Sequence, residues 1–271
     1  MQVGFKSDKG LMRSNNEDAC FVLLPDKVYV VADGVGGGNA GEIASRTAVS
    51  EIANYIVSHP LAEKDNKYAI VNYLQDCLDK ANRKIYELSH TYEENSGMAT
   101  TVVIVYAAAG KAYITNVGDS RAYLYRSGQL AQLTEDHTYV NTLVKAGILS
   151  PEQAELDERK NVITKALGAD KSVEPDFFQV EIQKDDRFLI CTDGLYDEVG
   201  DREMIEVLEQ YASMSEVCAE LIQRANRNGG HDNITVISLK VTEEDIYEHE
   251  IIGRQIRIDR EDRRGRHGDR L

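Results

Sequence analysis

The chain has 271 residues, 42% of them hydrophobic and 28% charged, which is ordinary for a soluble globular protein of one large domain or two small ones. The formal net charge of −15 argues against a nucleic-acid-binding surface, which needs clustered Lys and Arg. The sequence has no leader pattern and no apolar run of about 18 residues, so we expect a cytoplasmic protein without a membrane span. The cysteines form no C-x-x-C pair, which favours buried reduced thiols over a zinc or redox site.

Apolar runs and helical spacing come in blocks along the chain. Strands are predicted at 19–24, 27–32, 98–107, 111–117, 121–126, 176–182, 187–192 and 233–241. Helices are predicted at 41–58, at 67–90 and, in two segments, across 202–226. Ala109-Gly110 and Ser127-Gly128 mark hairpin turns, so part of the sheet should be antiparallel. Blocks of strands with helix pairs between them favour a layered α+β architecture over strict βαβ alternation.

The glycine-rich stretch at 36–41 matches G-x-G-x-x-G, a dinucleotide-binding pattern, and lies between a predicted strand and a predicted helix. A dinucleotide fold also needs a parallel strand right after that helix, with an acid about 20 residues past the glycines. Here a second helix follows instead. We therefore expect no nucleotide cofactor, and we expect the glycines to shape a turn and a close helix start.

Two segments stand outside the strand and helix blocks. Residues 137–170 form a mixed insertion between two predicted strands. From 243 onward the chain is dense in Arg, Asp and Glu and poor in large apolar residues, which predicts a mobile tail or a short exposed helix. The sequence therefore predicts a folded domain at 1–241 and a charged, Arg-rich tail at 242–271.

Four aspartates lie at the ends of runs apolar enough to be central strands: Asp33, Asp119, Asp193 and Asp232. Any one of them alone could simply form a turn. If the strand ends meet at one edge, the carboxylates lie together, and like charges at that range need cations to remain ionised. Ligands that are all oxygen favour Mg²⁺ or Mn²⁺ over Ca²⁺. Two such ions about 4 Å apart would activate a water molecule and hold a phosphate for in-line attack.

The stretch "RSNNEDA" at 13–19 adds a guanidinium and two more acids just before a predicted strand. Arg13 by itself could be an ordinary surface residue. Beside a metal-bound phosphate, however, a guanidinium is well suited to bind the phosphate through two hydrogen bonds.

The order of motifs over about residues 1–241 resembles the bacterial metal-dependent protein Ser/Thr phosphatases of type 2C, the PPM family. The motifs that carry this resemblance are "RSNNEDA" (13–19), "VADGVGG" (31–37), "GMATTVV" (97–103), "VGDSRAYL" (117–124), "LTEDHT" (133–138), "NVITKALG" (161–168), "ICTDGLYD" (190–197) and "HDNITVI" (231–237). The resemblance implies a four-layer αββα sandwich with two mainly antiparallel sheets, flanking helix pairs and a binuclear Mn²⁺ or Mg²⁺ site at one end.

The resemblance also assigns the metal ligands. Asp33 is expected to bridge two tightly bound ions, with the Gly34 carbonyl as a further ligand. Asp193 and Asp232 are expected to complete the shell of the first ion. Asp119, together with Asp193, corresponds to the pair that binds a weaker third ion.

Other residues are assigned in the same way. Glu17 and Asp18 are expected around the second ion, directly or through water, and Arg13 is expected to bind the substrate phosphate. The insertion at about 138–168 corresponds to a mobile flap beside the substrate cleft. Packing or supporting positions are expected at Thr100, Thr101, Ser120, Asn233 and His137.

The chain departs from the family where relatives carry a histidine that acts as general acid. Val35 and Asn39 occupy those positions, and the flap lacks the His-Pro that many relatives have. Only His137 and His231 adjoin the motifs, and for both we expect a supporting role, so that a metal-bound water supplies the proton. The expected activity is hydrolysis of phosphoserine and phosphothreonine in proteins, which reverses a partner Ser/Thr kinase. The alternative is a catalytically weak phosphoprotein-binding or scaffold protein on the same fold.

Overall fold

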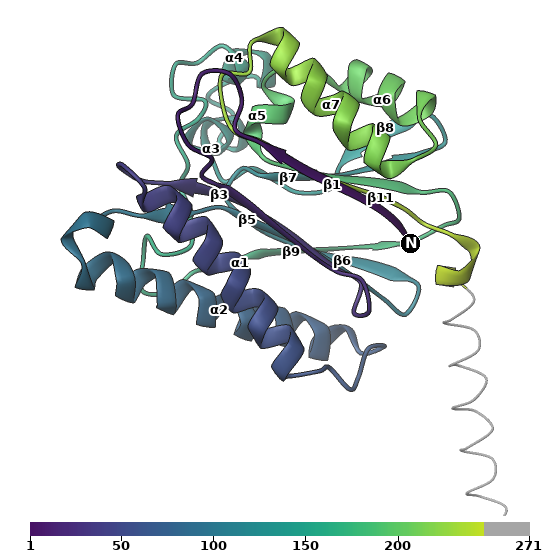
Figure 1. Cartoon of the computed structure of the whole chain (residues 1–271), viewed down its shortest axis with the longest axis horizontal. Helices are drawn as coiled ribbons and strands as arrows, with labels where there is room; N and C mark the ends of the chain where they lie inside the picture. The colour runs from purple at the N-terminus through teal and green to yellow at the C-terminus, as the bar shows by residue number, and fades with distance from the viewer. Residues whose placement is uncertain (247–271) are drawn as a thin grey trace, which may run out of the picture.

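The computed structural model describes residues 1–246, which form two antiparallel β-sheets stacked face to face (Figure 1). One sheet has the order β1-β11-β10-β7-β8. Its strands are β1 (Gln2–Asp8), β7 (Arg121–Arg126), β8 (Gln129–Gln132), β10 (Arg187–Cys191) and β11 (Ile234–Lys240). The other has the order β2-β3-β5-β6-β9, with β4 paired to β3. Its strands are β2 (Asp18–Leu23), β3 (Val28–Val35), β4 (Ala99–Thr100), β5 (Val102–Ala108), β6 (Lys111–Val117) and β9 (Asp176–Glu181).

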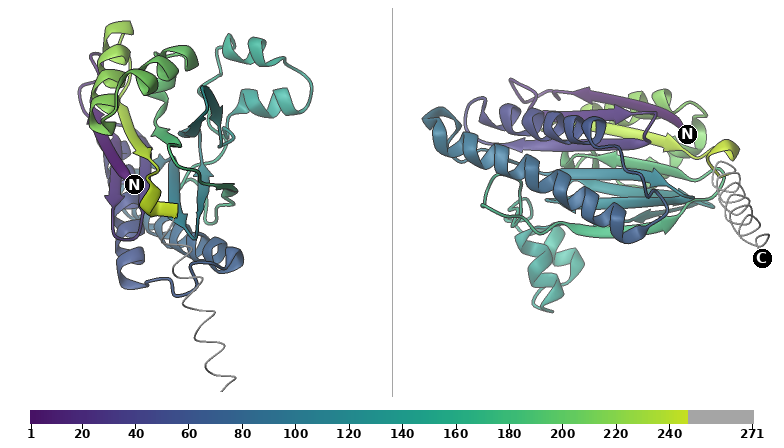
Figure 2. Two further views of the ribbon diagram at one scale, coloured as in Figure 1. Left: turned by 90° about the vertical axis from the view of Figure 1, so that its right-hand side faces the viewer. Right: turned by 90° about the horizontal axis from the view of Figure 1, so that it is seen from below.

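Helices cover the outer face of each sheet. The long helices α1 (Ala40–Ser58) and α2 (Lys67–Thr91) lie on the second sheet, and α6 (Asp201–Gln210) and α7 (Met214–Asn228) lie on the first (Figure 1). The short helix α5 (Asp193–Tyr196) follows β10, and a 3-10 turn η1 (Glu93–Asn95) follows α2. The insertion contains α3 (Tyr139–Lys145) and α4 (Pro151–Glu155), which project from the sandwich in Figure 2. The predicted αββα sandwich is thus confirmed.

Strand β3 shows why the central strands read as continuous apolar runs. Val28, Val30 and Ala32 face α1 and α2, whereas Tyr29 and Val31 face the other sheet. Successive side chains point to opposite faces, and both faces are covered, so every position must be apolar. The run ends at Asp33, where the strand reaches one end of the sandwich.

The two predicted hairpins are confirmed. Ala109 and Gly110 join β5 to β6, and Ser127 and Gly128 join β7 to β8, all with positive φ, as tight two-residue turns require. Two strands were missed by the sequence patterns, β1 and β8. Neither alternates cleanly between buried and exposed residues, because each is an edge strand of its sheet.

The predicted tail at 242–271 lies outside the described residues from 247 onward. Its first residues continue the fold: Asp245 is buried and accepts a hydrogen bond from the Met1 ammonium at 2.8 Å. Among the described residues, no helix combines the length and the apolar character needed to cross a membrane.

Candidate metal centre

The strand register brings the predicted carboxylates to one end of the sandwich. Asp18 on β2 pairs directly with Asp33 on β3. Asp193 begins α5 just after β10, and Asp232 lies two residues before β11, the neighbour of β10. Asp119 lies in the connection between β6 and β7. The topology therefore gathers side chains that are more than 200 residues apart in sequence.

These carboxylates lie close enough to raise one another's pKa values. Burial, followed by the charges of Asp18, Asp193, Asp119 and Asp232, raises the pKa of Asp33 well above its ordinary value. Burial is also the largest cause that raises the pKa of Asp18 and of Asp119 to about 7, and that of Asp193 to about 6. Four carboxyl groups that resist ionisation at one place are poised to bind a cation, because a positive charge would remove the repulsion.

The donor set fits a hard divalent ion in chemistry and charge. Oδ1 of Asp18 and Oδ1 of Asp193 are buried and have no hydrogen-bond partner, although buried oxygens are usually paired. Within residues 1–246, however, no three His, Cys, Asp or Glu side chains are already arranged around a single ion position. Ion binding therefore requires side-chain adjustment or further oxygen ligands, such as the Gly34 carbonyl and water.

Arg13 lies at this cluster, half-exposed, with its Nη2 2.6 Å from Oδ2 of Asp232. The loop before Arg13 is held to the segment before β11, because the backbone N–H groups of Leu11 and Met12 both donate to the Gly230 carbonyl. The structure thus places the residue predicted to bind phosphate beside the acidic cluster and open to solvent. Its guanidinium faces a carboxylate that was expected to bind metal, which ties adjustment of Asp232 to movement of Arg13.

The glycines around this site serve close backbone approach. A Cβ on Gly34 would come within 2.0 Å of the Gly41 carbonyl oxygen, and a Cβ on Gly41 within 2.4 Å of Oε2 of Glu17. Gly34 also donates its N–H to the Glu17 carbonyl at 3.1 Å. The start of α1, strand β3 and the Glu17 segment are therefore in direct contact. This contact explains the glycines at positions 34 and 41 by the close approach of their backbones.

The supporting residues contact the ligand backbone as expected. Thr101 Oγ1 accepts the Asp33 N–H at 3.0 Å and lies 2.6 Å from Ser120 Oγ. Thr100 donates its hydroxyl to the Asp33 carbonyl at 2.7 Å. Asn233 accepts the Glu17 N–H at 2.7 Å. These bonds fix the backbone of the predicted ligands.

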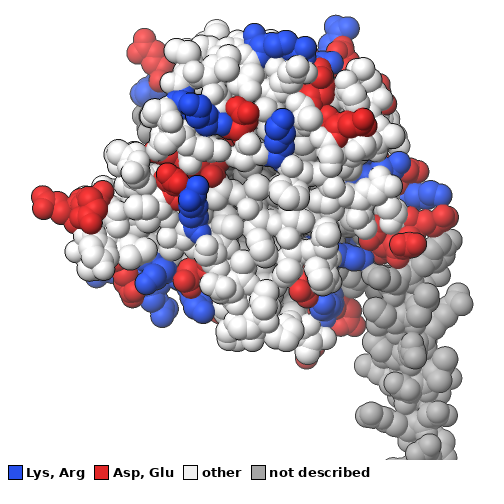
Figure 3. Space-filling model, viewed as in Figure 1, with Lys and Arg blue, Asp and Glu red and all other residues white. Residues whose placement is uncertain are grey.

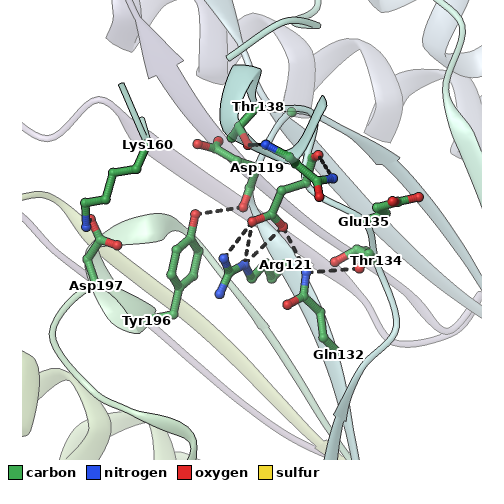
Figure 4. A network of polar contacts seen from close by, with 12 residues as sticks. Asp119, Arg121, Gln132, Thr134, Glu135, Thr138, Lys160, Tyr196 and Asp197 are labelled. Atoms are coloured by element: carbon green, nitrogen blue, oxygen red, sulfur yellow. Dashed lines mark hydrogen bonds and ion pairs between the residues drawn. The ribbon is translucent and has the colours of Figure 1, made fainter. Parts of the chain in front are cut away.

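Sequence reasoning missed Thr192, whose hydroxyl donates to Asp18 Oδ2 at 2.9 Å. It also missed the group around Asp119 drawn in Figure 4, where the Tyr196 hydroxyl donates to the Asp119 carbonyl at 3.0 Å. The Tyr196 ring lies under the Arg121 guanidinium, 3.5 Å from Cζ to the ring centroid. Arg121 in turn forms three hydrogen bonds with Asp136. For Thr192 the sequence offered one signal, its position directly before the predicted ligand Asp193.

The histidines near the motifs are already engaged. His137 is buried, and its Nδ1 accepts the Gly118 N–H at 3.1 Å. His231 is largely exposed, and its Nδ1 lies 2.6 Å from Oε1 of Glu198. Val35, which occupies one of the family histidine positions, is 45% exposed and carries no proton to donate.

A β-sandwich with clustered aspartates and a neighbouring arginine at one end is the arrangement expected of a metal-dependent phosphohydrolase. The protein phosphatase 2C family model matches residues 12–236. The chain belongs to this family and is a metal-dependent protein Ser/Thr phosphatase.

Individual relatives agree with this assignment. The chain is 38% identical over 243 residues to the serine/threonine phosphatase Stp of Listeria monocytogenes, covering 88% of this chain and 94% of that one. The solved phosphatase PstP/Ppp of Mycobacterium tuberculosis superposes with a TM-score of 0.81 at 33% identity, covering 89% of this chain and 99% of that one. A solved PstP catalytic domain in complex with two manganese ions has a TM-score of 0.79 at 34% identity, with 89% and 98% covered.

Proposed function

We propose that Asp33, Asp193 and Asp232, with the Gly34 carbonyl, hold two tightly bound Mn²⁺ or Mg²⁺ ions. Glu17 and Asp18 lie around the second ion, and Asp119 contributes with Asp193 to a weaker third site. The observation that carries this proposal is the meeting of strand ends at one end of the sandwich, where Asp18 pairs with Asp33 and where Asp193 and Asp232 lie next to the neighbouring strands β10 and β11. The raised pKa values of these aspartates agree with it. The two unpaired buried oxygens, on Asp18 and Asp193, support it.

When bound, the ions lower the pKa of the attacking water and neutralise charge on the phosphate. The residues of the chain itself hold the ligands in position. The hydroxyls of Thr100 and Thr101 hold the backbone of Asp33 on both sides, so that its carboxylate is presented at a fixed point. Fixed geometry of this kind lowers the entropic part of the barrier.

Arg13 binds the substrate phosphate in this proposal. Its side chain is half-exposed at the mouth of the cluster, and its fork of donors matches phosphate oxygens. The negative charge of Asp232 holds the guanidinium near the ions until a phosphate competes for it. Arg13 would then act on ground state and transition state alike.

The substrates are phosphoproteins, and we propose that a Ser/Thr kinase supplies them. The face shown in Figure 3 carries acidic and basic side chains interspersed, which is typical of a solvated surface. We further propose residues 1–241 as the body of the phosphatase domain, onto which the segment up to Asp245 packs, with the flap at about 138–168 beside the substrate cleft. The projection of α3 and α4 from the sandwich supports this division.

Hydrolysis of p-nitrophenyl phosphate and of a phosphothreonine peptide tests the proposal. Turnover should require Mn²⁺ or Mg²⁺, vanish in excess EDTA and return when the ion is restored. Turnover that persists in the chelator would refute the metal mechanism. Binding of the phosphopeptide without turnover in Mn²⁺ would favour the scaffold alternative.

A further inference from the structure

The ring of His137 forms a hydrogen bond with the turn that precedes Asp119, a predicted ligand of the third metal ion. Its Nδ1 accepts the backbone N–H of Gly118 at 3.1 Å, so in the neutral ring the proton is on Nε2. Nε2 lies 3.2 Å from Oδ2 of Asp176 on β9, although its N–H is not aimed well enough for a full hydrogen bond. The side chain is 5% exposed, so water cannot replace either contact readily.

Gly118 is held on its other side as well. Its carbonyl accepts the backbone N–H of His137 at 3.0 Å and the amide of Asn116 at 3.2 Å. Its φ of 101° suits glycine, and a Cβ there would come within 2.6 Å of the Thr101 side chain. The next residue is Asp119, which is 5% exposed. The orientation of the Gly118 peptide therefore determines the position from which the Asp119 side chain extends.

The same histidine lies at the root of the flap. The His137 carbonyl accepts the N–H of Thr164 at 2.7 Å, and Thr138 forms a β-bridge with Ile163. Both ends of the flap thus meet at His137. One residue joins the turn before Asp119 to the two chain segments that carry the flap.

We infer that His137 is a positioning residue: its Nδ1 holds the Gly118 peptide in place for Asp119 and couples that turn to the root of the flap. This inference rests on the proposed role of Asp119 as a metal ligand. It assigns His137 no proton transfer and no contact with substrate.

Two substitutions distinguish the contribution of Nδ1 from that of Nε2. In His137→Asn the amide oxygen can occupy the place of Nδ1 and still accept the Gly118 N–H. In His137→Gln the longer side chain can reach Asp176 in the place of Nε2 but leaves Gly118 without its acceptor. The control is His90→Gln on α2, where the ring forms hydrogen bonds with Ser89 and Tyr86 close in sequence.

Amide hydrogen exchange in the chelated full-length protein gives a readout independent of catalysis. We expect the Gly118 amide to exchange about tenfold faster in His137→Gln, because a buried N–H loses its acceptor, and within about threefold of wild type in His137→Asn and His90→Gln. Trypsin should also cleave the flap at Arg159 or Lys160 faster in the Gln variant. Equal Gly118 exchange in the Asn and Gln variants would overturn the inference.

Metal binding provides the second readout. Calorimetric titration with Mn²⁺ should show the weak site lost or weakened about tenfold in His137→Gln, with the tight sites kept. A Gln variant with wild-type affinity at the weak site would also overturn the inference. Failure of the proposed function is distinguishable, because it would appear as missing Mn²⁺-dependent turnover in the wild-type protein while the exchange results stand.

Discussion

Asp18 and Asp245 both have little solvent-accessible surface, 5% and 6% exposed, yet their pKa values are shifted in opposite directions. Burial, above all, raises the pKa of Asp18 to about 7, and the charges of Asp193 and Asp232 add to this despite hydrogen bonds from Thr235 and Thr192. Burial would raise the pKa of Asp245 too. There the hydrogen bonds from the Met1 ammonium, Thr242 and Lys27 prevail and lower it to about 2.

The state of a carboxyl group with little access to solvent depends on its partners as well as on its depth, because Asp18 is also more deeply buried than Asp245. Asp245 is surrounded by donors: the Met1 ammonium at 2.8 Å, Lys27 Nζ at 3.1 Å and the Thr242 hydroxyl at 2.7 Å. Asp18 keeps one oxygen without any partner. Balanced charge of the first kind stabilises a fold, whereas unbalanced charge of the second kind is characteristic of functional sites. Each prediction below tests one side of this contrast.

The largest effect on catalysis is expected for Asp33→Asn in the acidic cluster. The substitution removes the central negative charge but keeps nearly the same shape, so kcat with Mn²⁺ should fall at least about a hundredfold, or some 2.7 kcal/mol of barrier. Steady-state hydrolysis of the phosphothreonine peptide measures it. Asp245→Asn is the control and should stay within about threefold of wild type. Similar activity in the two variants would remove the distinction between the two carboxylates.

Asp245→Ala should mainly affect stability. It leaves the buried Met1 ammonium without its counter-charge, and we expect the free energy of unfolding to fall by about 3 kcal/mol in urea denaturation at pH 7. Because the folded pKa is lowered, this stabilisation is present above the ordinary value of 3.8 and is lost as the pH falls towards about 2. An unchanged unfolding midpoint would show that the ion pair contributes nothing.

Asp18→Asn should raise the free energy of unfolding when EDTA is present, whereas Asp245→Ala should lower it. The folded pKa of Asp18 is raised, so its contribution to stability is full below 3.8 and is lost as the pH rises to about 7. At pH 8 the variant should therefore be more stable than wild type by about 1–2 kcal/mol, and at pH 4 nearly equal. Urea denaturation at both pH values measures this. A variant less stable than wild type at pH 8 would contradict the electrostatic account.

The smallest effect is expected for Arg13→Ala. If the guanidinium binds phosphate equally in the ground and transition states, KM for the phosphopeptide should rise about tenfold, roughly 1.4 kcal/mol, while kcat changes less. Arg46→Ala provides a matched control, because Arg46 forms an exposed ion pair with Glu42 on α1. An unchanged KM in Arg13→Ala would show that Arg13 is an ordinary surface residue that does not bind the substrate phosphate.

Much of the site was predictable because its residues follow buried strands. The apolar runs that end at Asp33 and before Asp193 mark where the chain leaves the core, and Asp18 and Asp33 pair across adjacent strands. The order of motifs then indicated the family, and with it the layered fold. Thr192 was missed because its position beside Asp193 does not reveal its hydrogen bond to Asp18 on a strand far away in the sequence.

The sequence by itself determined the central strands, the long helices, the hairpin turns and the set of acidic residues, because each follows from local periodicity or turn chemistry. Only the tertiary structure decided the rest. Strand β1 exists because Val3 pairs with Leu239 on β11, and Gly4 is required there because a Cβ would overlap the Met214 backbone.

The partners of the charged groups were decided in the same way. Arg13 meets Asp232, and Met1 meets Asp245, across separations of 219 and 244 residues. No local pattern encodes such contacts, since they depend on which strands become neighbours after the sheets form. The motifs of the sequence already marked Asp18 as a candidate ligand, whereas only the fold made Asp245 a structural anion paired with Met1.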